Sequence, residues 1–109
     1  MNPVLLTIIT TPSVEQKLLD WLLTHDHQGF TTFACDGHGA RPERLSTAEQ
    51  VAGRQDRIAF WIQLSADRAH ELVAGLGSDF ADAGLHYWIS PLLEAGRISA
   101  SGAPAQAGR

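Results

Sequence analysis

Three segments of this chain carry large apolar side chains at both odd and even positions, and this feature restricts its fold most. They are residues 4–10, 58–64 and 85–90. Short, nearly continuous apolar runs rich in β-branched residues are typical of strands buried on both faces. Side chains alternate along a strand, so Ala59 and Trp61 are expected on the face opposite that of their neighbours. The chain therefore predicts a sheet with two apolar faces.

Two amphipathic helices are expected between the strands. Pro12 suits a first helical turn, and Ser13 with Gln16 has the spacing of a capping box. This helix is expected to end near residues 26–28, with Gly29 as its stop. A second helix is expected to begin after Ser65 as its cap. Its predicted buried stripe is Ala69, Leu72, Val73, Leu76 and Phe80.

The order of elements predicts the fold class. A strand at residues 30–35 completes two strand–helix–strand units, and Pro91 is expected to stop the last strand. This order is that of an α+β, ferredoxin-like βαββαβ sandwich. Its two helices can cover only one face of a four-stranded sheet. The other face would expose Trp61 and Trp88 in a patch larger than monomers normally tolerate, so we expect another subunit to cover it.

The segment between the second and third expected strands, residues 36–57, is unusually long and polar and is called the connection below. Excursions of about twenty residues inside a small domain are usually functional or disordered. Ser46 and Glu49 have capping-box spacing and Gly53 can end a helix, so one or two helical turns are expected here. The connection and its ends hold four of the seven arginines, which are Arg41, Arg44, Arg54 and Arg57.

Composition excludes several classes of protein. The formal charge is −4 and the pI is about 5.6, whereas nucleic-acid-binding domains usually have a basic face and a high pI. No apolar run approaches a membrane span, and Met1-Asn2-Pro3 lacks the basic start of a secretory signal, so we expect a cytosolic location. The single cysteine excludes an internal disulfide. Residues 1–98 are expected to form one domain, followed by a flexible tail at residues 99–109 that is poor in apolar side chains.

Several short motifs give the chain a resemblance to PII-like proteins, in particular to the branch encoded beside heavy-metal efflux pumps of the resistance-nodulation-division type. The resemblance covers residues 3–98. It rests on Gly37-His38-Gly39, Leu45-Ser46, Glu49-Gln50-Val51, Gly53-Arg54, Arg57, Gly84, His86-Tyr87-Trp88 and Leu93-Glu94-Ala95-Gly96-Arg97-Ile98.

The resemblance implies a homotrimer in which the long connection corresponds to the T-loop of PII proteins and projects toward a partner. Ordinary PII proteins bind adenine nucleotides through a loop rich in glycine and lysine before the last strand. Here the corresponding residues 77–84 are acidic and contain no Lys or Arg. Phosphate binding normally needs such cations, which argues against ordinary ATP or ADP binding. The tyrosine that PII proteins modify in their T-loop is also missing, because the only tyrosine here is Tyr87.

Cys35 and His38 form a candidate metal site where strand passes into connection. A thiolate and an imidazole three residues apart can both reach a soft or borderline cation such as Cu⁺, Zn²⁺ or Cd²⁺. Asp36, Glu94 or a neighbouring copy would have to complete the site. The alternative is that Cys35 is a small buried hydrophobic residue and His38 a turn residue. His25-Asp26-His27 also resembles a metal-binding tripeptide, but a solvated cap at a helix end is the favoured interpretation.

A second candidate site lies in the connection, where we expect an anion or a protein partner to bind. Its residues are His38, Glu49, Gln50, Arg54 and Arg57, because arginine binds carboxylates and phosphates bidentately. The alternative is an internal salt-bridge network, in which Arg54 or Arg57 pairs with Glu49 or Asp56. His70 is expected on the surface, and His86 and the three tryptophans are interpreted as structural.

The leading functional hypothesis is a cytosolic, homotrimeric signalling or regulatory protein. Its connection would sense a small ligand or metal and dock on an inner-membrane metal efflux transporter. The alternative is a metal-binding buffer like the CutA-type tolerance proteins. An enzyme is not expected, because the chain has no G-x-S-x-G, H-E-x-x-H or P-loop pattern.

Overall fold

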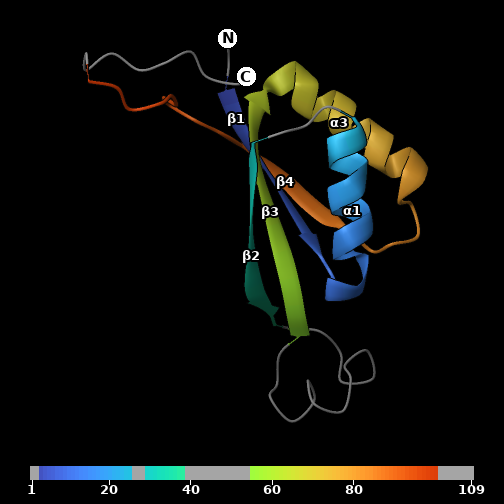
Figure 1. The fold of residues 1–109 in the computed structure, drawn as a ribbon. Coiled ribbons are helices and arrows are strands. Elements are labelled where there is room, and N and C mark those ends of the chain that lie inside the picture. The colour runs from blue at the N-terminus through green and yellow to red at the C-terminus, as the bar shows by residue number, and fades with distance from the viewer. Residues whose placement is uncertain (1–2, 26–28, 39–54, 101–109) are drawn as a thin grey trace.

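Four antiparallel strands form one sheet in the order β2-β3-β1-β4, and both helices cover one of its faces (Figure 1). The computed structural model describes residues 3–25, 29–38 and 55–100. The elements along the chain are β1 Pro3–Thr10, α1 Pro12–Thr24, β2 Phe30–Gly37, β3 Gln55–Ser65, α3 Ala66–Asp79 and β4 His86–Pro91. This arrangement confirms the predicted ferredoxin-like α+β sandwich.

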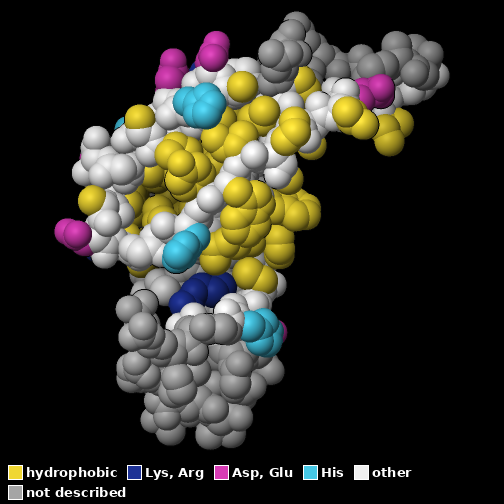
Figure 2. Space-filling view, turned by 180° about the vertical axis from the view of Figure 1, so that it is seen from behind, with side chains coloured by type: hydrophobic (Ala, Val, Ile, Leu, Met, Phe, Trp, Pro, Cys, Tyr) yellow, Lys and Arg dark blue, Asp and Glu magenta, His cyan; other side chains and the backbone are white. Residues whose placement is uncertain are grey.

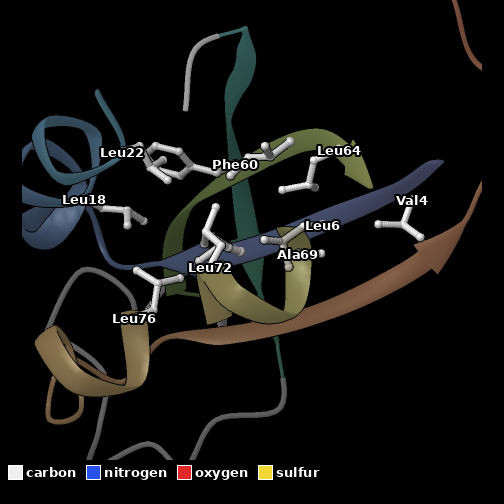
Figure 3. Packing of buried hydrophobic residues seen from close by; sticks show 11 residues of the cluster. Val4, Leu6, Leu18, Leu22, Phe60, Leu64, Ala69, Leu72 and Leu76 are labelled. Atoms are coloured by element: carbon white, nitrogen blue, oxygen red, sulfur yellow. The ribbon is translucent and has the colours of Figure 1, made fainter. Parts of the chain in front are cut away.

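The core lies between the helices and the covered face of the sheet (Figure 3). Every second residue of β1 and β3 points into it, as the alternation of a strand requires. The sheet contributes Val4, Leu6, Ile8, Phe60, Ile62 and Leu64, and the helices contribute Leu18, Leu22, Ala69, Leu72 and Leu76. Val73 and Phe80 of the predicted helical stripe pack against this cluster while remaining partly exposed.

The start of α1 differs from the predicted capping box. Thr11, not Ser13, is the N-cap and has extended backbone angles, and its side chain makes no capping hydrogen bond. The Thr11 and Ser13 hydroxyl oxygens lie 3.0 Å apart, and Gln16 Nε2 donates to Asp20 Oδ1 at 2.9 Å. Pro12 has no N–H to satisfy, so a proline at the first helical position reduces the need for a capping side chain.

The remaining helix ends agree more closely with the sequence. Helix α1 ends at Thr24, with His25 as its C-cap, so it is slightly shorter than predicted. Gly29 has a positive φ of 75°, a conformation that glycine adopts without steric cost. Ser65 caps α3 as predicted, because its hydroxyl oxygen accepts a hydrogen bond from the Arg68 backbone N–H at 3.3 Å.

Strands β2 and β3 both extend further toward their connection than the sequence indicated. The ladder continues through Cys35–Arg57 and Asp36–Asp56 to Gly37–Gln55, whereas strands were predicted only at residues 30–35 and 58–64. These last pairs could not be predicted from the apolar pattern, because their side chains are polar and the pattern ends before the backbone pairing does. The predicted short helix at Ser46–Val51 lies outside the described residues.

The last strand includes Pro91, which was expected to stop it. Pro91 pairs with Val4, and β4 lies at an edge of the sheet, where the missing N–H of proline is tolerated. Residues 92–100 then run away from the sheet without regular secondary structure (Figure 1). The Leu92 N–H donates to the Pro3 carbonyl oxygen at 3.2 Å.

Candidate ligand-binding site on the open face of the sheet

The sheet face opposite the helices, called the open face, presents ordered rows of side chains. One row consists of Thr31, Trp61, Thr7 and Trp88, and the next of Phe33, Ala59, Ile9 and His86. Beyond them, Cys35 lies opposite Arg57 and Gly37 opposite Gln55. Because paired residues on one face lie about 5 Å apart, the apolar rows and the polar pairs form one continuous surface. The polar pairs lie at the end that carries the connection.

The aromatic side chains of these rows remain substantially exposed in the single chain, whereas Thr7 and Ala59 between them are buried. Trp88 is 52%, Trp61 44% and Phe33 38% exposed. Phe33 and Trp61 pack edge to face, with ring centroids 4.8 Å apart. The prediction that both faces of the sheet are apolar is therefore confirmed, whereas coverage by a second subunit stays a prediction.

This face encloses a hollow of about 650 Å³. Its lining includes apolar residues of the two rows and the polar residues at the connection end, among them Cys35, Asp36, His38, Gln55 and Arg57. Figure 2 shows the yellow hydrophobic patch on this side of the molecule, with dark-blue basic and cyan imidazole groups at its border. The hollow thus combines an aromatic floor with cationic and imidazole groups at one end.

The predicted metal pair, Cys35 and His38, lies in this hollow. Cys35 is half-buried in β2 and His38 is exposed just after the strand. Asp36 lines the hollow as well. Glu94, the other predicted contributor, follows β4 at the opposite end of the sheet (Figure 1), so it cannot complete the same site within one chain.

Arg57 is the predicted partner-binding residue that the structure places most clearly. Its Nη1 donates to the Asp56 carbonyl oxygen at 2.8 Å. A Cβ added at Gly37 would lie 3.4 Å from Arg57 Cγ, so the Arg57 side chain passes directly beside that glycine. Glu49, Gln50 and Arg54 lie outside the described residues, and so do the salt bridges that were considered for them.

His86 is the residue of the hollow that sequence reasoning did not assign to a site. It was interpreted as structural, but it is exposed and lines the same hollow as Cys35, His38 and Arg57. Its pairing with Ile9 brings it there. Only the register across four strands shows that His86 lies in the row of Phe33, Ala59 and Ile9 on the open face.

No group of three or more His, Cys, Asp or Glu side chains is placed to hold a metal ion among residues 3–25, 29–38 and 55–100. A metal ion at Cys35 and His38 would need further ligands from a second copy or from the connection. His70 is exposed on α3, as predicted. His25 has its Nδ1 2.8 Å from the Trp21 carbonyl oxygen; it caps α1, while Asp26 and His27 lie outside the described residues.

A second hollow, of about 730 Å³, lies between the length of α1 and the C-terminal end of α3 with the turn that follows it. Trp21 Nε1 donates to Asp79 Oδ2 at 2.6 Å. Asp79 and Asp82 line this hollow, in residues 77–84, which the resemblance to PII proteins matches with their nucleotide loop. That segment is partly helical here, because α3 continues to Asp79 and only residues 80–85 form the turn into β4.

Solved structures with the same fold include PII-like proteins. CPII from Thiomonas intermedia K12, a nitrogen regulatory PII-like protein bound to ADP, AMP and bicarbonate, is 15% identical and has a TM-score of 0.66, with 90% of this chain and 98% of that chain covered. A putative PII-like signalling protein from Thermus thermophilus is 17% identical, with a TM-score of 0.59 and coverage of 84% of this chain and 90% of that chain. These similarities confirm a PII-like fold.

A structure from Shewanella baltica OS155 is more similar still. It is a DUF3240 family protein, 20% identical to this chain, with a TM-score of 0.72 and coverage of 91% of this chain and 99% of that chain. No curated protein matches the chain in sequence. No helix in the described part of the chain is long and apolar enough to cross a membrane. The profile of the family described as "Protein of unknown function (DUF3240)" matches residues 1–99, so the chain belongs to that family.

Proposed function

We propose that this protein is a PII-like regulatory module. In this proposal it is a cytosolic homotrimer, in which a small ligand bound at the connection end of the open face changes the state of the connection. The observation that carries the proposal is that Arg57, His38 and Cys35 line the connection end of one hollow beside an exposed aromatic surface. His86 lines the same hollow from β4, across β1 and β3 from Cys35.

The position of these groups suits a switch. Cys35–Arg57 is only two pairs from the end of the β2–β3 ladder at Gly37–Gln55. A ligand bound by Arg57 and His38 would therefore contact the chain near both ends of residues 38–54. A ligand can shift a conformational equilibrium only by its differential affinity for the two states. Side chains at the two ends of residues 38–54 are well placed to bind a ligand more tightly in one state of this segment than in the other.

A trimer would account for the exposed aromatic side chains of the open face. Trp61 and Trp88 would each bury a large apolar area on association, and a patch of this kind on a soluble protein usually marks an interface. In a closed trimer, we expect the polar end of each hollow to lie where subunits meet. Side chains from two copies could then bind the same small molecule.

The ligand class that this hollow favours is a small anion. The Arg57 guanidinium offers a planar set of donors, and the imidazoles of His38 and His86 line the same hollow. The bicarbonate bound by the similar CPII protein has this chemistry. Ordinary nucleotide binding at the helix ends is disfavoured, because phosphates would meet Asp79 and Asp82 there. We infer no catalytic role for these residues.

Calorimetric titration of the full-length protein with bicarbonate, phosphate and ADP tests the anion site. The Arg57→Gln variant should bind bicarbonate or phosphate at least tenfold more weakly than the wild type. The control is Arg68→Gln, which removes an exposed arginine of α3 outside the hollow and should change nothing. Equal binding of these anions by the wild type and Arg57→Gln would refute the anion site.

Hydrogen exchange with and without the bound anion tests the switch. Protection should rise in residues 38–54 and stay constant in α3. The proposed partner is an inner-membrane metal efflux transporter. Capture from cells by the wild type, compared with a variant in which residues 38–54 are replaced by Asn-Gly, should recover that transporter only with the wild type.

A metal-binding buffer of the CutA-like kind is the second candidate, favoured by the position of Cys35 and His38 in one hollow. In this case Cu⁺, Zn²⁺ or Cd²⁺ should bind tightly with little change in exchange of residues 38–54. Binding should be lost in a Cys35→Ser, His38→Ala double variant. Equal metal affinity of that variant and the wild type would exclude both residues as ligands.

A further inference from the structure

The middle of the open face has a depression formed by Thr7, Ile9 and Ala59, which line the hollow of about 650 Å³. Thr7 and Ala59 are each only 2% exposed. Their partners on β2 and β3 are larger, because Phe33 pairs with Ala59 and Trp61 pairs with Thr7. Both of these aromatic side chains are well exposed. Small side chains between large ones leave a recess that is lined mainly by apolar groups.

One end of this depression adjoins Arg57. Arg57 and Ala59 are two residues apart on β3, so they lie on the same face with their Cα atoms about 7 Å apart. The hydrogen bond to the Asp56 carbonyl oxygen uses one of the five N–H donors of the guanidinium. The other donors can bind an anion that lies next to the depression. Figure 2 shows a basic group directly beside the apolar surface on this side of the molecule.

The charges at this end favour a ligand with a single negative charge. Arg57 is the one Lys or Arg in the part of the lining that the structure describes, and Asp36 lines the same hollow. A dianion such as a phosphate monoester would be attracted by one guanidinium but repelled by this carboxylate. A carboxylate has one charge, and its two oxygens match the planar fork of arginine. The head group that fits best is therefore a carboxylate.

The volume of the hollow favours a ligand that is larger than its head group. A water molecule takes up about 30 Å³ in the liquid, so an ion as small as bicarbonate would leave most of the 650 Å³ filled with water. Small-molecule pockets usually have volumes of about 300–1,000 Å³, with mostly apolar linings and a few polar groups that orient the ligand. This hollow has that size and that division between an apolar middle and a polar end.

We infer that the ligand of the open face is a small organic carboxylate, whose carboxylate group binds Arg57 and whose apolar group fills the depression at Ala59 and Ile9. The inference rests on the proposed anion site and names its ligand class, a branched aliphatic or aromatic carboxylic acid. In the proposed trimer this ligand would lie where subunits meet, because the polar end of the hollow is expected there.

Calorimetric titration of the full-length protein with carboxylates of increasing apolar size tests the ligand class. Isovalerate and benzoate should bind at least tenfold more tightly than acetate, because each buried methylene tightens binding about fourfold. Isovaleramide has the same apolar group without the charge, and it should bind at least tenfold more weakly than isovalerate. Arg57→Gln should remove this difference between the acid and the amide.

Two substitutions test where the apolar group lies. Ala59→Leu fills the depression and Ile9→Thr makes it more polar, so each should reduce the preference for isovalerate over acetate at least threefold while acetate still binds. Ala74→Leu adds the same volume at an exposed position of α3 outside the hollow and should change nothing. Sedimentation of each variant measures whether association is unchanged. In the unaltered protein, nuclear Overhauser effects should connect the isovalerate methyl groups with those of Ala59 and Ile9, which locates the ligand even if a variant does not fold.

The outcomes separate this inference from the proposed function. Binding of acetate or bicarbonate that depends on Arg57, without tighter binding of isovalerate or benzoate, would overturn the inference and leave the anion site standing. Absence of binding by all of these anions would overturn both. Tighter binding of isovalerate that persists in Arg57→Gln, or that occurs without Overhauser effects to Ala59 and Ile9, would place the ligand elsewhere and also overturn the inference.

Discussion

Two glycines of α3 give a test of packing at the scale of a single residue. A Cβ at Gly75 would lie 3.2 Å from Trp21 Cζ2 and 3.3 Å from Cη2, whereas a Cβ at Gly77 would meet nothing within 4 Å. Trp21 cannot easily yield, because His25 stacks on it at 4.0 Å between ring centroids, Phe80 packs against its edge, and Asp79 accepts from its Nε1.

Alanine at these two positions should therefore have opposite effects on stability. Gly77→Ala should raise the free energy of unfolding by about 0.5–1 kcal/mol through helix propensity alone. Gly75→Ala should lower it below that of the wild type, because the clash outweighs the same gain. Urea unfolding followed by circular dichroism measures both. If Gly75→Ala is as stable as Gly77→Ala, Trp21 moves freely and its contacts do not fix it.

At the scale of an element, two adjacent leucines of α1 test how much the packing of this helix against the sheet contributes to stability. Leu22 is fully buried in the core, whereas Leu23 is 50% exposed. Leu22→Ala should lower the free energy of unfolding by about 2–5 kcal/mol, because it removes buried apolar volume and leaves a cavity. Leu23→Ala should change it by no more than about 0.5 kcal/mol. Similar losses in the two variants would mean that Leu23 is also buried in the assembled protein.

The elements show which parts of the fold follow from the sequence. Alternation of apolar residues in residues 58–64 was sufficient to predict both faces of β3, because burial and the two-residue period act locally. The start of α1 was missed because both Thr11 and Ser13 suit an N-cap, and Pro12 decides between them only through backbone geometry. The last pairs of β2 and β3 are held by backbone hydrogen bonds, which leave no apolar pattern.

The site was harder to predict than the fold. Cys35, His38 and Arg57 could be identified as candidates because they flank a long polar connection. That His86 lines the same hollow depends on the registers of three strand pairs, which bring residues far apart in sequence to one surface. Short-range patterns contain little information about such registers.

The whole molecule gives a prediction about association. Trp61→Gln together with Trp88→Gln should weaken self-association at least tenfold, because even 1.4 kcal/mol of lost binding free energy has that effect. Tyr87→Gln is the control, since Tyr87 is 54% exposed but lies beside Ile8, Val73 and Leu76 on the helix side. Sedimentation equilibrium measures all three proteins, and the wild type should have three times the chain mass of 11.8 kDa. Unchanged association of the double variant would show that the open face is not the interface.

The Gly37–Gln55 pair has a consequence for how such a protein diversifies. Paired residues of an antiparallel ladder have their Cα atoms about 4.5–5.5 Å apart, so the chain leaves and re-enters the sheet at nearly the same point. A sheet with this geometry can accept a segment of any length between these two paired positions. Relatives can therefore exchange one presented segment for another and acquire new specificity while inheriting an unaltered framework.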